Sequence, residues 1–322
     1  MPDHPTRIAL LSPGAKVGLT RAFVDAAQEA NCAVMAWEND PWSPAAALCA
    51  FRFGGGAIET DAAAEHLLAQ CLLHAVALVV PTRHDDLPTL AAHRDRFAEA
   101  GVTIAVSSPE AVRICCDKLE LAAWLLARRF PTPPLLASRS AAAVVLAGGA
   151  TLVAKHRGGS GSSRVRFVRT ATELADVPEE WILQPLAAGR EWTVHVHVDR
   201  TGRSVCEIPH ERLLVSDGEV LRARTGRLAH VMALAREIAE HLPAARGPLN
   251  IQMFVDATGG LLVTDVNPRF GGGYPLAHRA GGRSTAWLLA EYLFGHTLAR
   301  CDDWESGLLM VRYREATFHS KG

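Results

Sequence analysis

Two apolar, β-branched runs flank a short glycine-containing turn late in the chain and predict an antiparallel hairpin. The runs IQMFV and LLVTDV begin at Ile251 and Leu261, and the turn between them ends in two glycines. Glycine readily takes the positive φ that a short hairpin requires. With a four-residue loop, Asp256 is expected to face Leu261 and Gln252 to face Asp265. The hairpin therefore predicts the register of one antiparallel pair in the fold.

Polar side chains lie at the strand period of two along this hairpin. Asp265, Asn267 and Arg269 are expected to share one face, opposite Gln252. Directly opposed Cβ atoms lie roughly 4.5–5.5 Å apart, which allows an amide oxygen and a carboxylate oxygen to bind one ion. Oxygen ligands without thiol or imidazole favour Mg²⁺ or Mn²⁺ over zinc. The alternative is a solvated strand edge that ends in an Asn-Pro turn.

Composition excludes several classes of protein. The chain has 322 residues, enough for about two or three domains. Hydrophobic residues make up 49% and charged residues 21%, and the formal net charge is −1, so no global field favours nucleic acid or a membrane surface. No segment is predicted to span a bilayer and the N-terminus is unlike a signal peptide, so the cytoplasm is the expected location. The seven cysteines lack framework spacing and are expected to be reduced.

The first hundred residues alternate between short apolar runs and helical patterns, which is typical of a parallel βαβ sheet. The expected strands are residues 8–11, 33–37, 77–80 and 102–106, and the expected helices are residues 19–30, 62–74 and 86–100. The turn SPGAKVG after the first strand is interpreted as structural; anion binding at the following helix is the alternative.

Two lysines lie beside sequence features that suit phosphate binding. Lys118 is at the start of a helix that is expected to run to about Arg129, where FPTPP ends it. Lys155 ends a predicted strand, and the glycine-serine loop HRGGSGSS follows before the chain returns as another strand. The loop is not a P-loop because no helix and no Gly-Lys-Ser/Thr ending follow the glycines. It can wrap phosphate oxygens or be an ordinary hairpin.

A second pair of predicted strands follows the glycine loop. WILQPL leads through Gly189, Arg190 and Glu191 into an alternating run with valines on one face and His195 and His197 on the other. With no third nitrogen or sulfur ligand apparent, the histidines are expected to cover a polar sheet face rather than bind a metal. A helix over residues 229–242 then leads into the hairpin.

Taken in order, these elements resemble the ATP-grasp superfamily, in particular single-chain members similar to the ATP-binding half of the carbamoyl-phosphate synthase large subunit. The resemblance covers nearly the whole chain and implies an α/β (α+β) ATP-grasp fold. It implies an N-terminal βαβ domain (residues 1–108), a small lid subdomain (109–184) and a C-terminal antiparallel-sheet subdomain (185–322).

The resemblance also implies the roles of individual residues. Those expected to contact ATP are Lys118, Lys155, Gly158, Gly159, Ser160, Gly161, Ser162, Gln184, Pro185, Leu186 and Glu191. Gln252, Asp265 and Asn267 would hold Mg²⁺ or Mn²⁺, and Arg269 would stabilise charge on the transferring phosphoryl group or the tetrahedral intermediate. This sequence has Asp265 where the family usually has glutamate, and His156 where proline is common.

The implied reaction is ADP-forming ligation of a small carboxylate to an amine through an acyl phosphate, with an amino acid or small peptide as the expected substrate. Arg212 is the candidate for binding the substrate carboxylate; a salt bridge with Glu211 or Glu219 is the alternative. The rival functions are an enzyme that makes an acyl or carbamoyl phosphate without amide formation and a non-catalytic nucleotide-binding regulator. A homodimer is the favoured assembly only because homodimers are the commonest oligomers of soluble proteins.

Overall fold

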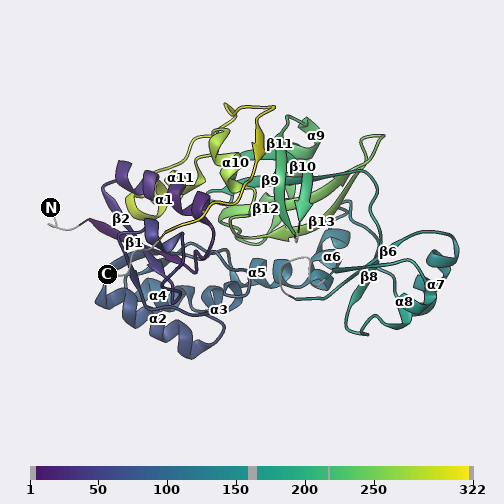
Figure 1. Ribbon diagram of the computed structural model, residues 1–322, viewed down its shortest axis with the longest axis horizontal. Helices are drawn as coiled ribbons and strands as arrows, with labels where there is room; N and C mark the ends of the chain where they lie inside the picture. Colours follow the sequence, from purple (N-terminus) through teal and green to yellow (C-terminus); the bar gives the residue numbers. More distant parts are fainter. Residues whose placement is uncertain (1–4, 159–164, 217, 319–322) are drawn as a thin grey trace.

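The computed structural model describes residues 5–158, 165–216 and 218–318, which form three sheets surrounded by helices (Figure 1). The first sheet is parallel, and the other two are antiparallel. The three-stranded sheet lies at one end of the molecule, and the parallel sheet lies at the other (Figure 1). The predicted α/β architecture is confirmed.

The N-terminal sheet has the strand order β3-β2-β1-β4-β5. Its strands are β1 (Thr6–Leu11), β2 (Cys32–Trp37), β3 (Phe51–Phe53), β4 (Val76–Val80) and β5 (Thr103–Ile104). Its helices are α1 (Val17–Glu29), η1 (Ala46–Leu48), α2 (Asp61–Leu73), α3 (Leu87–Ala92) and α4 (Arg94–Glu99). The single helix expected over residues 86–100 is therefore two helices, which meet at His93. The strand order reverses at β1, and open α/β sheets bind ligands beyond the carboxyl ends of the strands at such a point.

Two short helices connect this sheet to the three-stranded sheet, whose order is β7-β6-β8. The elements are α5 (Pro109–Cys116), α6 (Lys118–Ala127), α7 (Arg139–Ala147), β6 (Leu152–Lys155), β7 (Val165–Val168), α8 (Ala171–Ala175) and β8 (Ile182–Pro185). Asp117 begins α6 because its carboxylate accepts hydrogen bonds from the amides of Leu119 and Glu120. This cap fixes the position of Lys118 at the first turn.

The six-stranded sheet has the order β13-β12-β9-β10-β11-β14. Its strands are β9 (Arg190–Val198), β10 (Ser204–Ser216), β11 (Glu219–Thr225), β12 (Gly247–Val255), β13 (Leu261–Asn267) and β14 (Leu309–Val311). The helices of this part are α9 (Ala229–His241), α10 (Tyr274–Arg279) and α11 (Ser284–Phe294). The valines of β9 pack with α9 and α6 in one core, and a second core joins α10 and α11 to α1 of the N-terminal sheet.

Within the described ranges, no helix is long and apolar enough to cross a membrane. All seven cysteines are free, and four of them are buried. Burial raises the pKa of Cys71 to about 12, so this thiol has the character of a core residue.

Candidate active site

The β12–β13 hairpin places Gln252 directly opposite Asp265, as the sequence predicts. The expected pairing of Asp256 with Leu261 is wrong, because Val255 faces Leu261 instead. The register shifts by one residue between Gln252 and Met253, which leaves Thr264 as an extra residue on β13. This bulge restores the pairing of Gln252 with Asp265.

Asp256 lies in the turn rather than in the strand because its side chain organises the loop. Its Oδ1 accepts hydrogen bonds from Thr258 N at 2.7 Å and Gly260 N at 2.9 Å. Its own backbone N donates to Gly260 O at 2.9 Å and closes the turn. Aspartate commonly bonds to backbone groups two residues further on in this way.

Asp265, Asn267 and Arg269 form a hydrogen-bonded chain beyond the bulge. Asn267 Nδ2 donates to Asp265 Oδ2 at 3.0 Å, and Arg269 Nη2 donates to Asn267 Oδ1 at 3.3 Å. Burial acts to raise the pKa of Asp265, but the charges of Lys118 and Lys155 and the bond from Asn267 hold this pKa below its usual value. Asp265 is therefore ionised at neutral pH and is available as a ligand.

These donors fit a hard divalent cation that arrives with phosphate groups. Gln252 and Asn267 offer amide oxygens, and Asp265 offers the ionised carboxylate, the kind of donor set that Mg²⁺ accepts. Among the described residues, no group of three or more His, Cys, Asp or Glu side chains gathers as a metal site. One carboxylate beside two lysines is a weak cation site by itself, so nucleotide phosphates would have to supply the remaining ligands.

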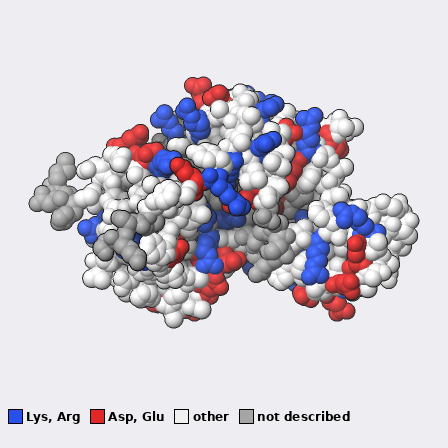
Figure 2. All heavy atoms as spheres, in the orientation of Figure 1, with Lys and Arg blue, Asp and Glu red and all other residues white. Residues whose placement is uncertain are grey.

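The two predicted phosphate-binding lysines lie on different elements and line one narrow cavity of about 10 Å³, which has room for about one water molecule. The cavity is bounded by Lys118 of α6, Lys155 of β6, Gln184 of β8 and Thr264 at the bulge of β13. Lys155 Nζ lies 3.5 Å from Thr264 O. Burial lowers the pKa of Lys155, and the charge of Asp265 opposes this shift. Figure 2 shows Lys and Arg side chains gathered near the centre of the molecule, where the parallel sheet meets the six-stranded sheet.

The predicted adenine-contacting segment follows this cavity along β8. Gln184 is 4% exposed, and its Nε2 donates to Pro133 O at 2.9 Å. Leu186 has an exposed side chain, while its backbone N donates to Thr151 O at 2.9 Å. The backbone N–H of Leu186 is thus already bonded within the protein, whereas its exposed side chain offers an apolar contact. In the glycine loop, Gly158 is described, whereas Gly159, Ser160, Gly161 and Ser162 lie outside the described residues.

Arg212 and Glu191 bind one another. Arg212 Nη1 lies 2.6 Å from Glu191 Oε1, and Arg212 Nη2 donates to Gly218 O at 2.9 Å. The alternative, a salt bridge of Arg212 with Glu211 or Glu219, is wrong in its partners, because Glu211 pairs with Arg190 and Glu219 with Arg312. Because β9 and β10 are antiparallel neighbours, Glu191 and Arg212 lie side by side. Arg212 Nε has no hydrogen-bond partner in the described part of the chain, so Arg212 keeps a donor besides this ion pair.

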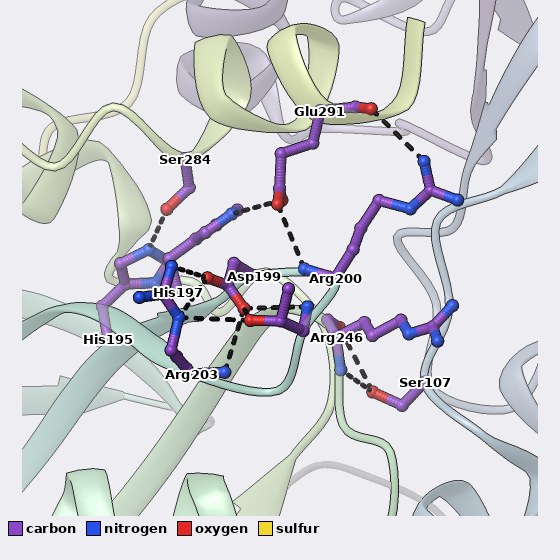
Figure 3. Close-up of polar contacts among 10 residues, drawn as sticks. Ser107, His195, His197, Asp199, Arg200, Arg203, Arg246, Ser284 and Glu291 are labelled. Carbon is purple, nitrogen blue, oxygen red and sulfur yellow. Dashed lines mark hydrogen bonds and ion pairs between the residues drawn. The ribbon is translucent and has the colours of Figure 1, made fainter. Parts of the chain in front are cut away.

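His195 and His197 do not cover a polar sheet face, because α10 and α11 bury them completely. His195 Nε2 lies 2.7 Å from Ser284 Oγ, and His197 Nε2 lies 3.8 Å from Glu291 Oε2 (Figure 3). Burial lowers the pKa of both histidines. The lowered pKa values keep both imidazoles neutral, as is typical of buried core histidines.

The sequence pattern did not identify His84 and Asn250 as residues that influence Arg269 or are influenced by it. His84 follows the carboxyl end of β4 and is 6% exposed, and neither ring nitrogen has a hydrogen-bond partner in the described part of the chain. Burial and the charge of Arg269 lower its pKa to about 4. Asn250 Nδ2 donates to the carbonyl of Arg269 and so orients the segment that carries this guanidinium. Its position two residues before Gln252, on the same face of β12, was the available signal.

The three glycines after Arg269 differ in whether the surrounding atoms leave room for a side chain. A Cβ at Gly271 would lie 2.3 Å from Asn250 Oδ1, and one at Gly273 would lie 2.3 Å from His210 Nε2. A Cβ at Gly272 would meet only the end of Arg312, at 3.9 Å. Two of the three glycines therefore permit close packing, and the middle one borders open space.

Comparisons of sequence identify the family. A family model of the ATP-grasp domain matches residues 115–273, and a model described as the PylC-like N-terminal domain matches residues 8–105. No match was found among curated protein sequences. The chain belongs to the ATP-grasp superfamily, and the predicted enzyme class, an ADP-forming ATP-grasp ligase, is confirmed at this level.

Solved structures of low sequence identity share the fold. The biotin carboxylase domain dimer of 2-oxoglutarate carboxylase from Hydrogenobacter thermophilus, in complex with MgADP, ADP and bicarbonate, has a TM-score of 0.75 and 14% identity over 94% of this chain and 73% of its own. N5-carboxyaminoimidazole ribonucleotide synthetase from Thermotoga maritima has a TM-score of 0.68 and 19% identity over 91% of this chain and 77% of its own. A complex described as biotin carboxylase-beta-gamma-ATP from Campylobacter jejuni has a TM-score of 0.73 and 13% identity over 94% of this chain and 74% of its own.

Proposed function

We propose that the protein joins a small carboxylate to an amine, with ATP converted to ADP and with an acyl phosphate as intermediate. One observation supports this proposal most strongly. Lys118 and Lys155, from separate elements, approach one another across a narrow cavity beside the hairpin on which Gln252 faces Asp265. Two cations and a cation-binding carboxylate at one place suit a nucleotide triphosphate with its metal ion.

Each residue then has a role that its chemistry allows. Lys118 and Lys155 neutralise the phosphates, and the segment from Gln184 to Leu186 borders the adenine. Glu191 accepts hydrogen bonds from the ribose, and Arg212 binds the substrate carboxylate. Gln252, Asp265 and Asn267 would hold Mg²⁺ or Mn²⁺, which would supply positive charge to neutralise the phosphates.

The reaction proceeds in two steps. The substrate carboxylate oxygen attacks the γ-phosphorus of ATP and ADP leaves, which produces a mixed anhydride. The amine nitrogen then attacks the carbonyl carbon and phosphate leaves, while the amine loses a proton. Arg269, which is partly buried and bonded to Asn267, stabilises the negative charge that develops in either step. A site shielded from water protects the anhydride from hydrolysis.

A carboxylating enzyme is the second candidate, with bicarbonate as the carboxylate. Its support is the bicarbonate named with the biotin carboxylase domain of similar fold. In this variant the acceptor gains a carboxyl group from a carbonic-phosphoric anhydride. A regulator that binds nucleotide without turnover remains the rival from a different class.

The test is ADP release from ATP and Mg²⁺ across a panel of amino acids, simple carboxylates and bicarbonate, with mass spectrometry of every positive sample. An amide mass supports the ligase, and a carboxylated acceptor supports the second candidate. Nucleotide binding without release in any sample supports the regulator. Light scattering of the purified protein tests the proposed homodimer.

A further inference from the structure

Asp117 has a second partner besides the helix that it caps. Its Oδ1 accepts from Leu119 N at 2.8 Å, which is the capping bond of α6. Its Oδ2 lies 2.6 Å from Arg157 Nη2 and 3.1 Å from Arg157 Nε, a two-pronged contact. One carboxylate therefore joins the start of α6 to the residue at which β6 enters the glycine loop.

The backbone reinforces this contact. Lys118 N donates to Arg157 O at 2.8 Å, and Asp117 forms an isolated antiparallel β-bridge with Gly158. Lys118 directly follows one member of the ion pair, and Lys155 lies two residues before the other. These contacts join the two segments that carry Lys118 and Lys155, the lysines that line the cavity.

The charges suit a contact that persists whether or not nucleotide is bound. Burial acts to raise the pKa of Asp117, but the bonds from Arg157 and from the amides of α6 hold this pKa below its usual value. Asp117 is therefore ionised at neutral pH. The pair adds no net charge beside Lys118 and Lys155, whose like charges repel one another when no phosphate lies between them.

We propose that Asp117 and Arg157 are a positioning pair, which holds Lys118 and Lys155 at the spacing that allows both to contact the phosphates of one nucleotide. The inference rests on the proposed function and adds two residues to its machinery. A purely structural ion pair would act differently. The side chains of Arg157 and Asp117 are 43% and 28% exposed, and pairs this accessible to water contribute little to stability. Loss of the pair should therefore weaken nucleotide binding more than folding.

The experiment is calorimetric titration of the full chain with Mg²⁺ and the non-hydrolysable analogue AMPPNP. Asp117→Asn keeps an N-capping side chain and removes the charge, and Arg157→Gln removes the other member. We expect each substitution to raise the Kd about tenfold, since a displaced charged group loses its directed contact with phosphate. The double variant should bind no more weakly than either single variant, because both remove the same interaction. Thermal unfolding is expected to change little.

Arg113→Gln is the matched control, because Arg113 forms an exposed ion pair with Glu120 of α6 at 2.7 Å without touching the cavity. It should leave the Kd unchanged. Wild-type affinity in both test variants, or effects that simply add in the double variant, would overturn the positioning pair while leaving the proposed function intact. If Asp117→Asn unfolds the protein, Arg157→Gln decides alone, since Arg157 is not the cap. No binding by the wild-type chain would overturn both the proposed function and the inference.

Discussion

The three-stranded sheet and the rest of the molecule are built differently. The parallel sheet and the six-stranded sheet share one core, in which Phe23 of α1 meets Phe270 with ring centroids 5.3 Å apart. Gly18 of α1 packs against Pro275 so closely that a Cβ would lie 2.9 Å from its ring. The three-stranded sheet instead packs with α7 and α8 around a small core of its own. We call the first unit the body and the second the lid sheet.

Several of the contacts between the two units are polar and local. They include Gln184 with Pro133 O, Lys155 with Thr264 O, and Asp117 with Arg157. A unit with a separate core and few apolar links can shift or open at lower cost than the body can. Since Lys155 belongs to the lid sheet and Asp265 to the body, the proposed site is assembled from both units. The comparison predicts that stability and catalysis depend on the body, and nucleotide affinity on both.

The largest expected effect comes from the shared core. Phe23→Ala should cost about 3–5 kcal/mol, because it removes a fully buried ring and leaves a cavity. Both sheets of the body should lose stability together, as measured by the free energy of unfolding in urea and by amide hydrogen exchange. Leu174→Ala in the lid-sheet core is the counterpart and should lower protection within the lid sheet alone. Faster exchange in the parallel sheet only, after Phe23→Ala, would mean that the body is two units.

Arg269→Ala tests the body's role in catalysis. We expect turnover to fall about 100-fold or more, since a preorganised charge that stabilises the transition state is lost. The Kd for Mg-AMPPNP should change far less, because Lys118 and Lys155 remain in place. Initial rates of ADP release with a substrate found in the panel, together with calorimetry, separate the two effects. A large loss of nucleotide affinity with normal turnover at saturation would assign Arg269 to binding instead.

Lys155→Ala tests the lid sheet's role in nucleotide affinity. We expect the Kd for Mg-AMPPNP to rise about tenfold, since a charge-assisted contact to phosphate is lost. Arg166→Ala on neighbouring β7 is the control, because Arg166 stacks over Trp181 rather than lining the cavity. An equal loss of affinity in both variants would indicate a general disturbance of the lid sheet.

Local patterns predicted much of the hairpin. The strand period and the glycine turn placed Gln252 opposite Asp265, because both signals act within a few residues. The pairing of Asp256 with Leu261 failed because the Asp256 side chain organises its own loop, and because Thr264 forms an unpredicted bulge. An extra residue does not change the apolar character of a strand, so the bulge could not be predicted from the residue pattern.

Contacts between segments that are distant in the chain could not be predicted from the sequence. Alternation in β9 is the same whether its second face meets water or a helix, so the burial of His195 and His197 under α10 and α11 was not visible. His84 lies far along the chain from Arg269, and only the packing of the two sheets brings its imidazole under the influence of that charge. The pairing of Glu191 with Arg212 likewise depends on the register of β9 with β10.

The body and the lid sheet should also differ in their sensitivity to acid. Burial first, and then the charge of Arg212, lower the pKa of His210 in β10 to about 4, against an ordinary value of 6.5. Between these pH values the unfolded chain binds a proton that the folded chain does not, so the free energy of unfolding decreases as the pH falls from 6.5 towards 4. His210→Gln should reduce this slope by up to one proton, about 1.4 kcal/mol per pH unit.

Urea unfolding at pH 7 and at pH 5 measures this slope, and hydrogen exchange locates the loss of stability. His230→Gln is the matched control, because His230 is exposed on α9 and its removal should leave the slope unchanged. Since His195, His197 and His210 all lie in the six-stranded sheet, acid should loosen the body before the lid sheet. Earlier loss of protection in the lid sheet, or an unchanged slope in His210→Gln, would contradict the assignment of acid sensitivity to these buried imidazoles.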